Sequence, residues 1–399
     1  MKRVVILCVW LFSVVAGHAQ LSLDECRRLA RENYPEIRQY DLVHQTEQYN
    51  LSNAARAWIP QLAFSAQATW QTDAPNFPKE LTGMLAQQGL EIPGLRKDQY
   101  KVALELNQTI WDGGKSVADK RIARAEAAEQ KTMTDVDLYE LEGRVDDLYF
   151  GILLLDERIA QTNLTLNLLR SNLEKVRALQ RNGVAMQSDA DVLEAELLSV
   201  GQQLIQFESS CDSYRRMLGI FIGQKVGDRK LQRPSAVQPL SGESARPELA
   251  MFAAKIDRLT AQEKMVKSSS MPRLGFFAQG YYGYPGLDYM QGMMNSDWSW
   301  NAMLGVKLSW NFGAYYTQKN NLDKLRTSRQ QVEVQRDVFL FNMNLQAAQE
   351  NGDIARLRKA IADDDRIVAL RRSVREAAES KLRNGIIDKI GRASCRERV

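Results

Sequence analysis

The sequence contains an internal duplication with a period of roughly 200 residues. The motif Pro35-Glu36-Ile37 returns 212 positions later as Pro247-Glu248-Leu249, and Pro60 returns at the same offset as Pro272. Further along, Arg181-Asn182-Gly183 returns 202 positions later as Arg383-Asn384-Gly385. Solenoid repeats are much shorter, about 20–50 residues, so this period indicates a duplicated half-protein. We expect a first repeat over residues 20–233 and a second over residues 234–389.

Both ends of the sequence differ in character from the duplicated part. Lys2-Arg3, the apolar run Val4 to Ala16 and the small residues of Gly17-His18-Ala19 predict a secretory signal peptide over residues 1–19. Residues 390–399 look like the translation of a sequencing adapter joined to an unfinished gene. We therefore expect the natural chain to continue past about Lys389, which makes the second repeat a truncated one; a genuine basic tail is the alternative.

Charge and residue counts exclude several classes of function. Five of the 53 Lys and Arg residues and one of the 49 Asp and Glu residues fall in the two end segments. The rest of the chain is therefore close to neutral, and its composition gives no reason to expect a nucleic-acid partner. His44 is the only histidine left, which argues against histidine-ligated metals and histidine-based triads. Cys26 and Cys211 remain, either as two buried free thiols or as one disulfide.

Two long proline-free tracts predict helices. From Leu138 to Val176, apolar residues recur in steps of three and four, which is the pattern of a helix that packs on other helices. The motif Ser22-Leu23-Asp24-Glu25 is a capping box and predicts a helix start, and Asn182-Gly183 predicts a reversal between two helices. We expect helices over 22–57, 114–180 and 186–219 in the first repeat, and over 246–270 and 314–382 in the second.

Four segments between the helices have the two-residue period of a β-strand. They lie near residues 61–72, 99–111, 273–284 and 298–312, and the last has the clearest alternation. In that segment we expect Leu304, Val306, Leu308 and Trp310 to face lipid and Asn301, Lys307 and Ser309 to face a wet lumen. Tryptophans mark the segment ends, as they do in membrane barrels, although a soluble half-buried sheet has the same alternation. Four strands cannot close a barrel, since the smallest membrane barrels need about eight, so other copies of the chain must supply the rest.

Several motifs, taken in their order along the chain, resemble one family. They are Leu21-Ser22-Leu23-Asp24-Glu25, Asn33-Tyr34-Pro35-Glu36, Trp111-Asp112-Gly113-Gly114, Arg181-Asn182-Gly183 with Asp191-Val192-Leu193, and Leu308-Ser309-Trp310-Asn311-Phe312-Gly313. Together with the duplication they resemble the TolC family of outer-membrane efflux proteins, in its Bacteroidetes-type branch, over residues 20 to about 389.

The resemblance implies an α+β membrane protein built from a duplicated helix–strand–strand–long-helix-hairpin unit. It implies a homotrimer in which a twelve-stranded β-barrel in the outer membrane continues into a periplasmic α-helical barrel. Such channels do no chemistry and need no cofactor. They are passive conduits for small molecules or proteins in tripartite efflux or type I secretion systems. Their partners are outer-membrane lipid, a periplasmic adaptor protein and an inner-membrane pump of the RND, ABC or MFS class.

Particular residues follow from the same resemblance. Gly183 and Gly385 correspond to the tips of the helical hairpins. An aspartate eight residues after the first tip glycine contributes to the periplasmic aperture in the family, which points to Asp191, with Asp189 beside it. The alternative for both aspartates is an ordinary role in capping or solvating a helix start.

Two other classes of protein share some of these features. A periplasmic membrane-fusion adaptor is also exported and has a coiled-coil hairpin, but it has one hairpin, whereas the hairpin pattern here occurs twice. A periplasmic enzyme is the second alternative, yet no combination of nucleophile, base and orienting group stands out. The glycine-rich run from Gly280 to Gly286 is typical of a strand end and a turn rather than a phosphate loop.

Overall fold

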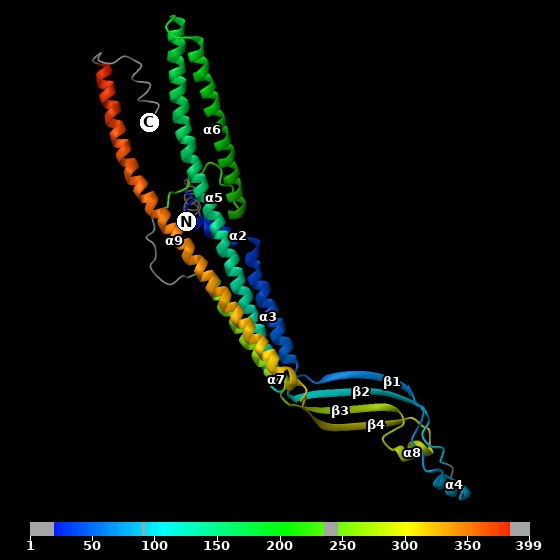
Figure 1. Ribbon diagram of the computed structural model, residues 1–399. Coiled ribbons are helices and arrows are strands. Elements are labelled where there is room, and N and C mark those ends of the chain that lie inside the picture. The colour runs from blue at the N-terminus through cyan, green and yellow to red at the C-terminus, as the bar shows by residue number, and fades with distance from the viewer. Residues whose placement is uncertain (1–19, 90–91, 235–245, 384–399) are drawn as a thin grey trace, which may run out of the picture. The chain divides into compact units, whose positions relative to one another are not determined.

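The computed structural model describes residues 20–89, 92–234 and 246–383 of the chain (Figure 1). The expected signal peptide, Gly385 and the expected adapter-derived tail lie outside the described residues. The chain divides into two compact units, residues 1–328 and 329–399, which are described separately below. In the described part of the second unit the chain is entirely helical, because it is the continuation of α9 (Ala314–Arg383).

The N-terminal helix is shorter than the sequence pattern predicts. In place of one helix over 22–57, the structure has α2 (Leu23–Asn33), a 3₁₀ turn (Pro35–Arg38) and α3 (Gln39–Arg56). Pro35 causes the break, because its ring disfavours the helical conformation for the preceding residue, and Tyr34 is extended with φ −68° and ψ 126°. The start of α2 is as expected: the Ser22 hydroxyl accepts the backbone N–H of Glu25 at 3.2 Å.

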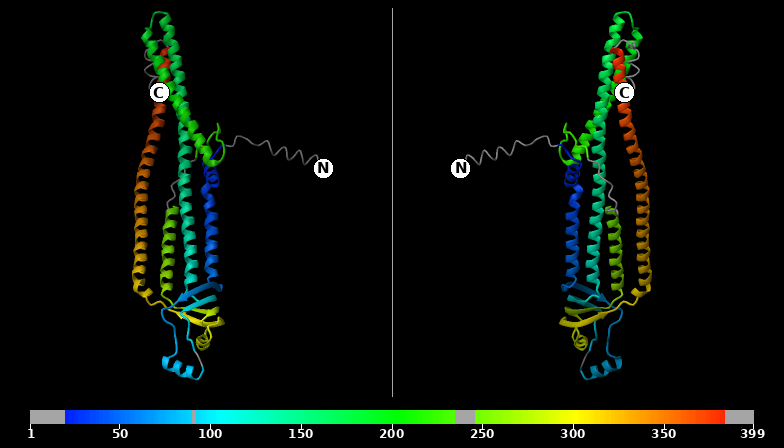
Figure 2. Two further views of the ribbon diagram at one scale, coloured as in Figure 1. Left: turned by 90° about the vertical axis from the view of Figure 1, so that its right-hand side faces the viewer. Right: turned by 90° about the vertical axis from the view of Figure 1, so that its left-hand side faces the viewer.

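The long helix α5 (Lys115–Arg181) packs against four other helices of the first unit. It has 67 residues and is therefore about 100 Å long. Its first part contacts α7 (Pro247–Ser269) and α3, its middle contacts α2, and its last part contacts α6 (Gln187–Ile222), as Figures 1 and 2 show. The predicted apolar seam from Leu138 to Val176 is buried or half-buried throughout, which is the physical reason for the helix-on-helix packing.

Ion pairs follow the same order along α5. From its first part to its last, α5 pairs with α7, α3, α2 and α6 through Glu129–Arg258, Lys131–Glu47, Asp146–Arg27 and Asp156–Arg215. The guanidinium of Arg27 binds both oxygens of Asp146, a bidentate geometry that fixes the rotation of α2 on α5. These ion pairs therefore match each neighbouring helix to one part of α5.

The main core lies where α2, α5 and α6 meet. Its fully buried members include Cys26, Val145, Tyr149, Ile152 and Leu218. The Tyr149 hydroxyl lies 2.7 Å from the carbonyl oxygen of Leu21 and 2.6 Å from that of Gln232, so it connects the start of α2 to the segment after α6. Leu21 and Leu231 also form a parallel β-bridge. The core therefore joins the beginning of the first repeat to its end.

Both described cysteines are free and buried in this core. Burial, and to a smaller extent Glu25, raises the pKa of the Cys26 thiol to about 12. The alternative of a disulfide between Cys26 and Cys211 is therefore not what the structure has.

The four strands form one antiparallel sheet with the order β1-β2-β3-β4. The strands are β1 (Gln61–Trp70), β2 (Asp98–Trp111), β3 (Arg273–Tyr284) and β4 (Ser299–Ser309). The short helix α4 (Lys79–Gln87) lies between β1 and β2, and α8 (Tyr289–Met294) lies between β3 and β4; neither is in the sequence-based prediction. Strands from the first repeat and from the second therefore share a single sheet (Figure 1).

One correction concerns the last strand. It ends at Ser309, so Trp310 and Phe312 lie beyond it, although the alternation predicts a strand over 298–312. The indole N–H of Trp310 donates to the Ser270 carbonyl at 3.0 Å, and the Trp310 ring lies 4.8 Å from that of Phe312. These contacts direct Trp310 toward the C-terminal end of α7, and α9 begins at Ala314. Trp310 is therefore a residue of the sheet–helix junction rather than of the strand.

Candidate functional site

One face of the sheet is apolar across all four strands. The register places Phe64 opposite Leu104, Ala278 opposite Leu304, and Tyr282 opposite Trp300. In β4, the side chains of Trp300, Leu304, Val306 and Leu308 are 82%, 76%, 65% and 66% exposed. A contiguous apolar surface of this kind indicates contact with a membrane or another protein. The even-numbered residues predicted to face lipid thus share one face, except Trp310, which lies outside the strand.

The opposite face of the same sheet is polar. Gln279 connects two charged side chains on β2: its Oε1 accepts Lys101 Nζ at 2.9 Å, and its Nε2 donates to Glu105. Lys101 Nζ also lies 4.6 Å from the ring centroid of Tyr281. Sequence analysis missed this network, because its members come from β2 and β3, which are about 175 residues apart, and only the register brings them together.

The odd-numbered β4 residues predicted to face a lumen lie on this polar face. Lys307 pairs with Gly275 in the register, Ser309 with Arg273, and Asn301 with Tyr281. Asn301 has a structural role as well, since its Oδ1 accepts the backbone N–H of Leu287 at 2.7 Å, in the loop before α8. The sheet therefore has one apolar and one polar surface, as a wall between lipid and water would need.

Aromatic rings lie at both ends of the apolar face. At the loop end, Trp298 lies 5.7 Å from Tyr100 and 5.3 Å from Tyr282, and Tyr282 lies 5.0 Å from Trp300, measured between ring centroids. At the helix end, Trp310 packs on Phe312. The nine steps from Trp300 to Ser309, the last residue of β4, span about 30 Å along the strand, which is about 21 Å in depth at a tilt of about 45°. Membrane barrels have an apolar band of about 25 Å between two aromatic girdles, so the spacing fits.

The turn between α5 and α6 forms the other end of the first unit. Gly183 has φ +76°; its N–H donates to the Gln180 carbonyl at 2.9 Å, and the N–H of Val184 donates to the Leu179 carbonyl at 2.9 Å. This is a Schellman motif, which needs a left-handed residue and therefore favours glycine. Gly183 is thus the end of a helical hairpin, and Val184 and Met186 beside it are 73% and 74% exposed.

The two aspartates after this turn have different surroundings. Asp189 Oδ2 accepts the backbone N–H of Met186 at 3.0 Å, so Asp189 caps the start of α6. Asp191 is exposed, and its Oδ1 accepts the side-chain amide of Gln187 at 2.7 Å. Asp191 therefore carries no backbone capping bond, and its carboxylate is available at the surface. Gly385, the matching tip residue of the second repeat, lies outside the described residues.

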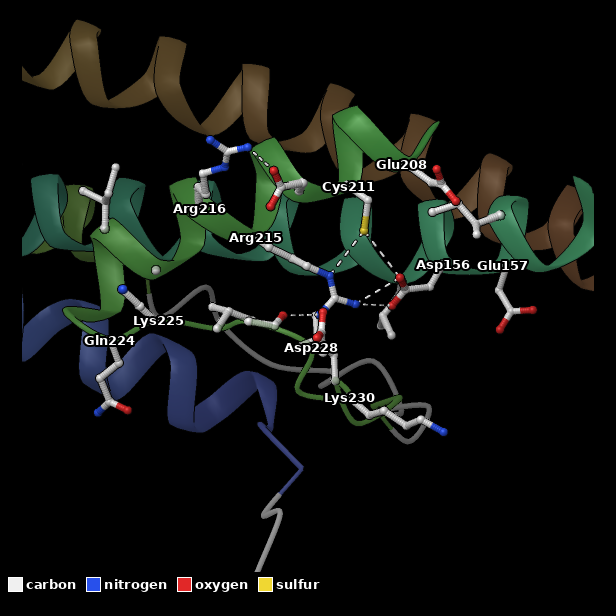
Figure 3. Close-up of a pocket in the computed structure, with 18 of the residues that line it drawn as sticks. Asp156, Glu157, Glu208, Cys211, Arg215, Arg216, Gln224, Lys225, Asp228 and Lys230 are labelled. Carbon is white, nitrogen blue, oxygen red and sulfur yellow. Dashed lines mark hydrogen bonds and ion pairs between the residues drawn. The ribbon is translucent and has the colours of Figure 1, made fainter. Parts of the chain in front are cut away.

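A cleft of about 1260 Å³ lies beside the C-terminal half of α6 (Figure 3). Arg215 is at its centre: it binds both oxygens of Asp156, at 2.8 and 3.0 Å, and donates to the carbonyls of Gly227 and Arg229. The Cys211 thiol lies 3.3 Å from Arg215 Nε and 3.4 Å from Asp156 Oδ1. Burial raises the pKa of this thiol, which keeps it protonated. These contacts tether the turn after α6, and they leave no activated nucleophile here.

Two general features complete the description. Within residues 20–89, 92–234 and 246–383, no group of three or more His, Cys, Asp or Glu side chains is arranged to hold a metal ion. In the same part of the chain, no helix is both long enough and apolar enough to cross a membrane.

Comparison with known proteins agrees with this architecture. The family model described as "Outer membrane efflux protein" matches residues 27–223, and no curated protein matches the chain. The solved structure of the outer membrane protein VceC from Vibrio cholerae has 15% identity and a TM-score of 0.65, covering 94% of this chain and 89% of VceC.

Two further channel structures are similar. CusC, whose structures address transmembrane channel formation, has 14% identity and a TM-score of 0.67, covering 95% of this chain and 86% of CusC. The open state of the Neisseria gonorrhoeae MtrE outer membrane channel has 16% identity and a TM-score of 0.57, covering 91% of this chain and 80% of MtrE. At these sequence identities the solved structures show only that they share a fold with this chain. The assignment to a family rests on the family model. Residues 27–223 of the chain belong to the outer membrane efflux protein family.

Proposed function

We propose that this protein is the outer-membrane channel of a tripartite efflux or type I secretion system. In this role it is a passive conduit for small molecules or proteins that an inner-membrane pump exports. The observation that carries the proposal is the sheet with an apolar, aromatic-bounded face and a polar face, attached to helices about 100 Å long. Such a sheet can line a water-filled passage through lipid, and the helices can extend that passage into the periplasm.

Three copies of the chain would complete the barrel. Among the described strands, β1 and β4 each have one unpaired edge, and exposed edges pair readily with another chain. Pairing β4 of one copy with β1 of the next would close a ring, and three copies would supply twelve strands. Membrane barrels need at least about eight strands and have no free edges, which supports a closed homotrimer.

The helical tip is the proposed contact with the partners. Val184 and Met186 are exposed apolar side chains at the turn, which is the composition expected of a docking contact. We propose that a periplasmic adaptor binds there and connects the channel to an RND, ABC or MFS pump. The alternative that this chain is itself an adaptor is disfavoured, because a water-soluble protein covers the apolar face of a sheet, whereas this face is exposed.

Asp191 is the proposed aperture residue. Three exposed copies near a symmetry axis would form a ring of carboxylates, and such a ring favours cations over anions at a constriction. Asp189, the second predicted aperture residue, also caps the start of α6. The Arg177–Glu194 ion pair, at 2.7 Å, joins α5 to α6 close to the turn and would hold the aperture residue in place.

Reconstitution tests the proposed channel. The purified protein should need detergent for extraction, run as a trimer after chemical cross-linking, and give stepwise conductance in planar bilayers. A periplasmic adaptor would instead be released without detergent and give no conductance. A water-soluble monomer without channel activity would therefore refute the proposal, and a conducting assembly with another number of subunits would refute only the trimer.

A further inference from the structure

The polar face of the sheet has an uncompensated pair of cations at its helix end. Arg273 begins β3, and Lys307 lies near the end of β4. Arg273 pairs with Ser309 and Lys307 with Gly275, so the two side chains are diagonal neighbours on one face. Diagonal neighbours across antiparallel strands are about 7–8 Å apart, within reach of long side chains. Two like charges so close together repel each other, and packing of the sheet alone gives no reason for them.

Neither cation has a partner within the described part of the chain. No hydrogen bond or ion pair joins the side chain of Arg273 or of Lys307 to any described residue. This contrasts with Lys101 on the same face, which is connected to Glu105 through Gln279. The polar face therefore has a balanced pair of charges in its middle and two unbalanced positive charges at its helix end.

The two cations line a cleft with a volume of about 480 Å³ at the junction of the sheet and α5. Its lining includes polar groups from all four strands, among them Gln61, Asn107, Arg273, Lys307 and Ser309. The cleft is large enough for a phosphate, sulfate or carboxylate group together with water, and its donors can bind oxygen atoms.

The two carboxylates in this cleft are already engaged. Asp112 accepts the backbone N–H groups of Gly114 at 2.9 Å and Ser116 at 2.6 Å, and it also accepts the Ser116 hydroxyl. Asp119 pairs with Lys115 at 2.7 Å. Asp119 is neutralised by Lys115, and the Asp112 oxygens bind the first turn of α5. Three cations, Lys115, Arg273 and Lys307, line the cleft against these two carboxylates, so the cleft as a whole is positive.

We propose that Arg273 and Lys307 form an anion-binding site in the lumen, which favours cargo bearing a phosphate, sulfate or carboxylate group. The inference rests on the proposed channel function, because only a closed barrel turns this face into a lumen wall. Three chains would place six cations around the passage at the periplasmic end of the barrel. At about 10 Å in water and 0.1 M salt, six screened charges raise the local anion concentration roughly fivefold.

Ion selectivity in planar bilayers tests the proposal. The variant Arg273→Gln/Lys307→Gln removes both charges and keeps a polar side chain at each position. The reversal potential in a KCl gradient should show a fall in the anion-to-cation permeability ratio of about two- to fivefold, because other parts of the conduit also contribute. Block by added tripolyphosphate should weaken by a similar factor. The matched control Lys79→Gln/Lys97→Gln also removes two cations, at the start of α4 and just before β2. It should change the permeability ratio and the tripolyphosphate block much less.

The outcomes separate the possible failures. The anion-binding site would be refuted if both double variants had equal effects, or if neither had an effect, in a protein that still forms conducting trimers. The proposed channel function would be unaffected by that result. An effect that appears only in bilayers containing phosphatidylglycerol would assign the cations to lipid headgroups and also refute the anion-binding site. Absence of conductance in the unaltered protein would refute the proposed function itself. Trimer yield of each variant, measured by cross-linking, excludes misfolding as the cause of a lost signal.

Discussion

Placing arginine at the centre of the apolar face tests the membrane assignment most directly. Leu304 is the middle residue of the 11-residue strand β4, its side chain is 76% exposed, and it lies opposite Ala278. The five residues from Leu304 to either end of β4 span about 17 Å along the strand, or about 12 Å in depth at a tilt of about 45°. Leu304 should therefore lie at the midplane of the bilayer.

The cost of the substitution follows from this depth. An arginine on the lipid face of a barrel costs about 2–4 kcal/mol at the midplane and about 0–1 kcal/mol near the interfaces. Leu304→Arg should lower the unfolding free energy by about 2–4 kcal/mol per chain, or about 6–12 kcal/mol for a trimer. Leu308→Arg lies four residues, about 10 Å in depth, closer to the helix end and should cost about 0–1 kcal/mol per chain. Met303→Arg places the same side chain on the polar face and should be tolerated, as should Lys307→Ala.

The measurement is urea-induced unfolding of protein folded into phosphatidylcholine vesicles, followed by tryptophan fluorescence, with heat-stable oligomers on gels as a second readout. A Met303→Arg cost as large as that of Leu304→Arg would refute the assignment of the two faces. Equal costs at Leu304 and Leu308 would refute the depth argument while leaving the faces intact. Labelling of single cysteines at odd positions of β4 by a lipid-soluble reagent would contradict the register.

Three further predictions concern the helical part. Tyr149→Phe should lower the unfolding free energy by about 0.5–1.5 kcal/mol, because the fully buried hydroxyl no longer bonds the carbonyls of Leu21 and Gln232, whereas Tyr49→Phe, at an exposed position, should change denaturant midpoints little. Burial opposes ionisation of Asp112, but hydrogen bonds from Ser116 and Gly114 lower its pKa overall. The stabilisation by the Asp112 carboxylate is therefore complete above its pKa in the unfolded chain, about 4, and is lost as the pH falls below that value. Asp112→Asn should lower the unfolding free energy by about 0.5–2 kcal/mol at pH 7. Unfolding curves at pH 7 and pH 3 should show that the difference between the two proteins shrinks in acid. Asp191→Asn should alter conductance or weaken block by multivalent cations in bilayers at unchanged trimer yield, and unchanged conductance and block would make Asp191 a surface residue without a role in the aperture.

Local features of this protein could be predicted from sequence because their causes are local. The period of three and four residues specifies the buried seam of α5, since a helix with that pattern has to bury one stripe. The two-residue period specifies which β4 side chains share a face. Asn182-Gly183 specifies the turn, because the Schellman motif needs a left-handed residue just after the helix. The break at Pro35 also has a local cause, in the proline ring, although the helix pattern alone obscures it.

Other features depend on which segments pair in space, and periodicity does not contain that information. The sheet joins β2 of the first repeat to β3 of the second, and only this pairing brings Lys101 and Glu105 to Gln279. The cations Arg273 and Lys307 become neighbours through the β3–β4 register, and their lack of partners is visible only once Asp112 and Asp119 are seen to be engaged. The sequence by itself thus determined the elements and the faces they bury, because these depend on backbone preferences and hydrophobic spacing over a few residues. The tertiary structure decided the charge pattern of the polar face, because strand register joins side chains that are far apart along the chain.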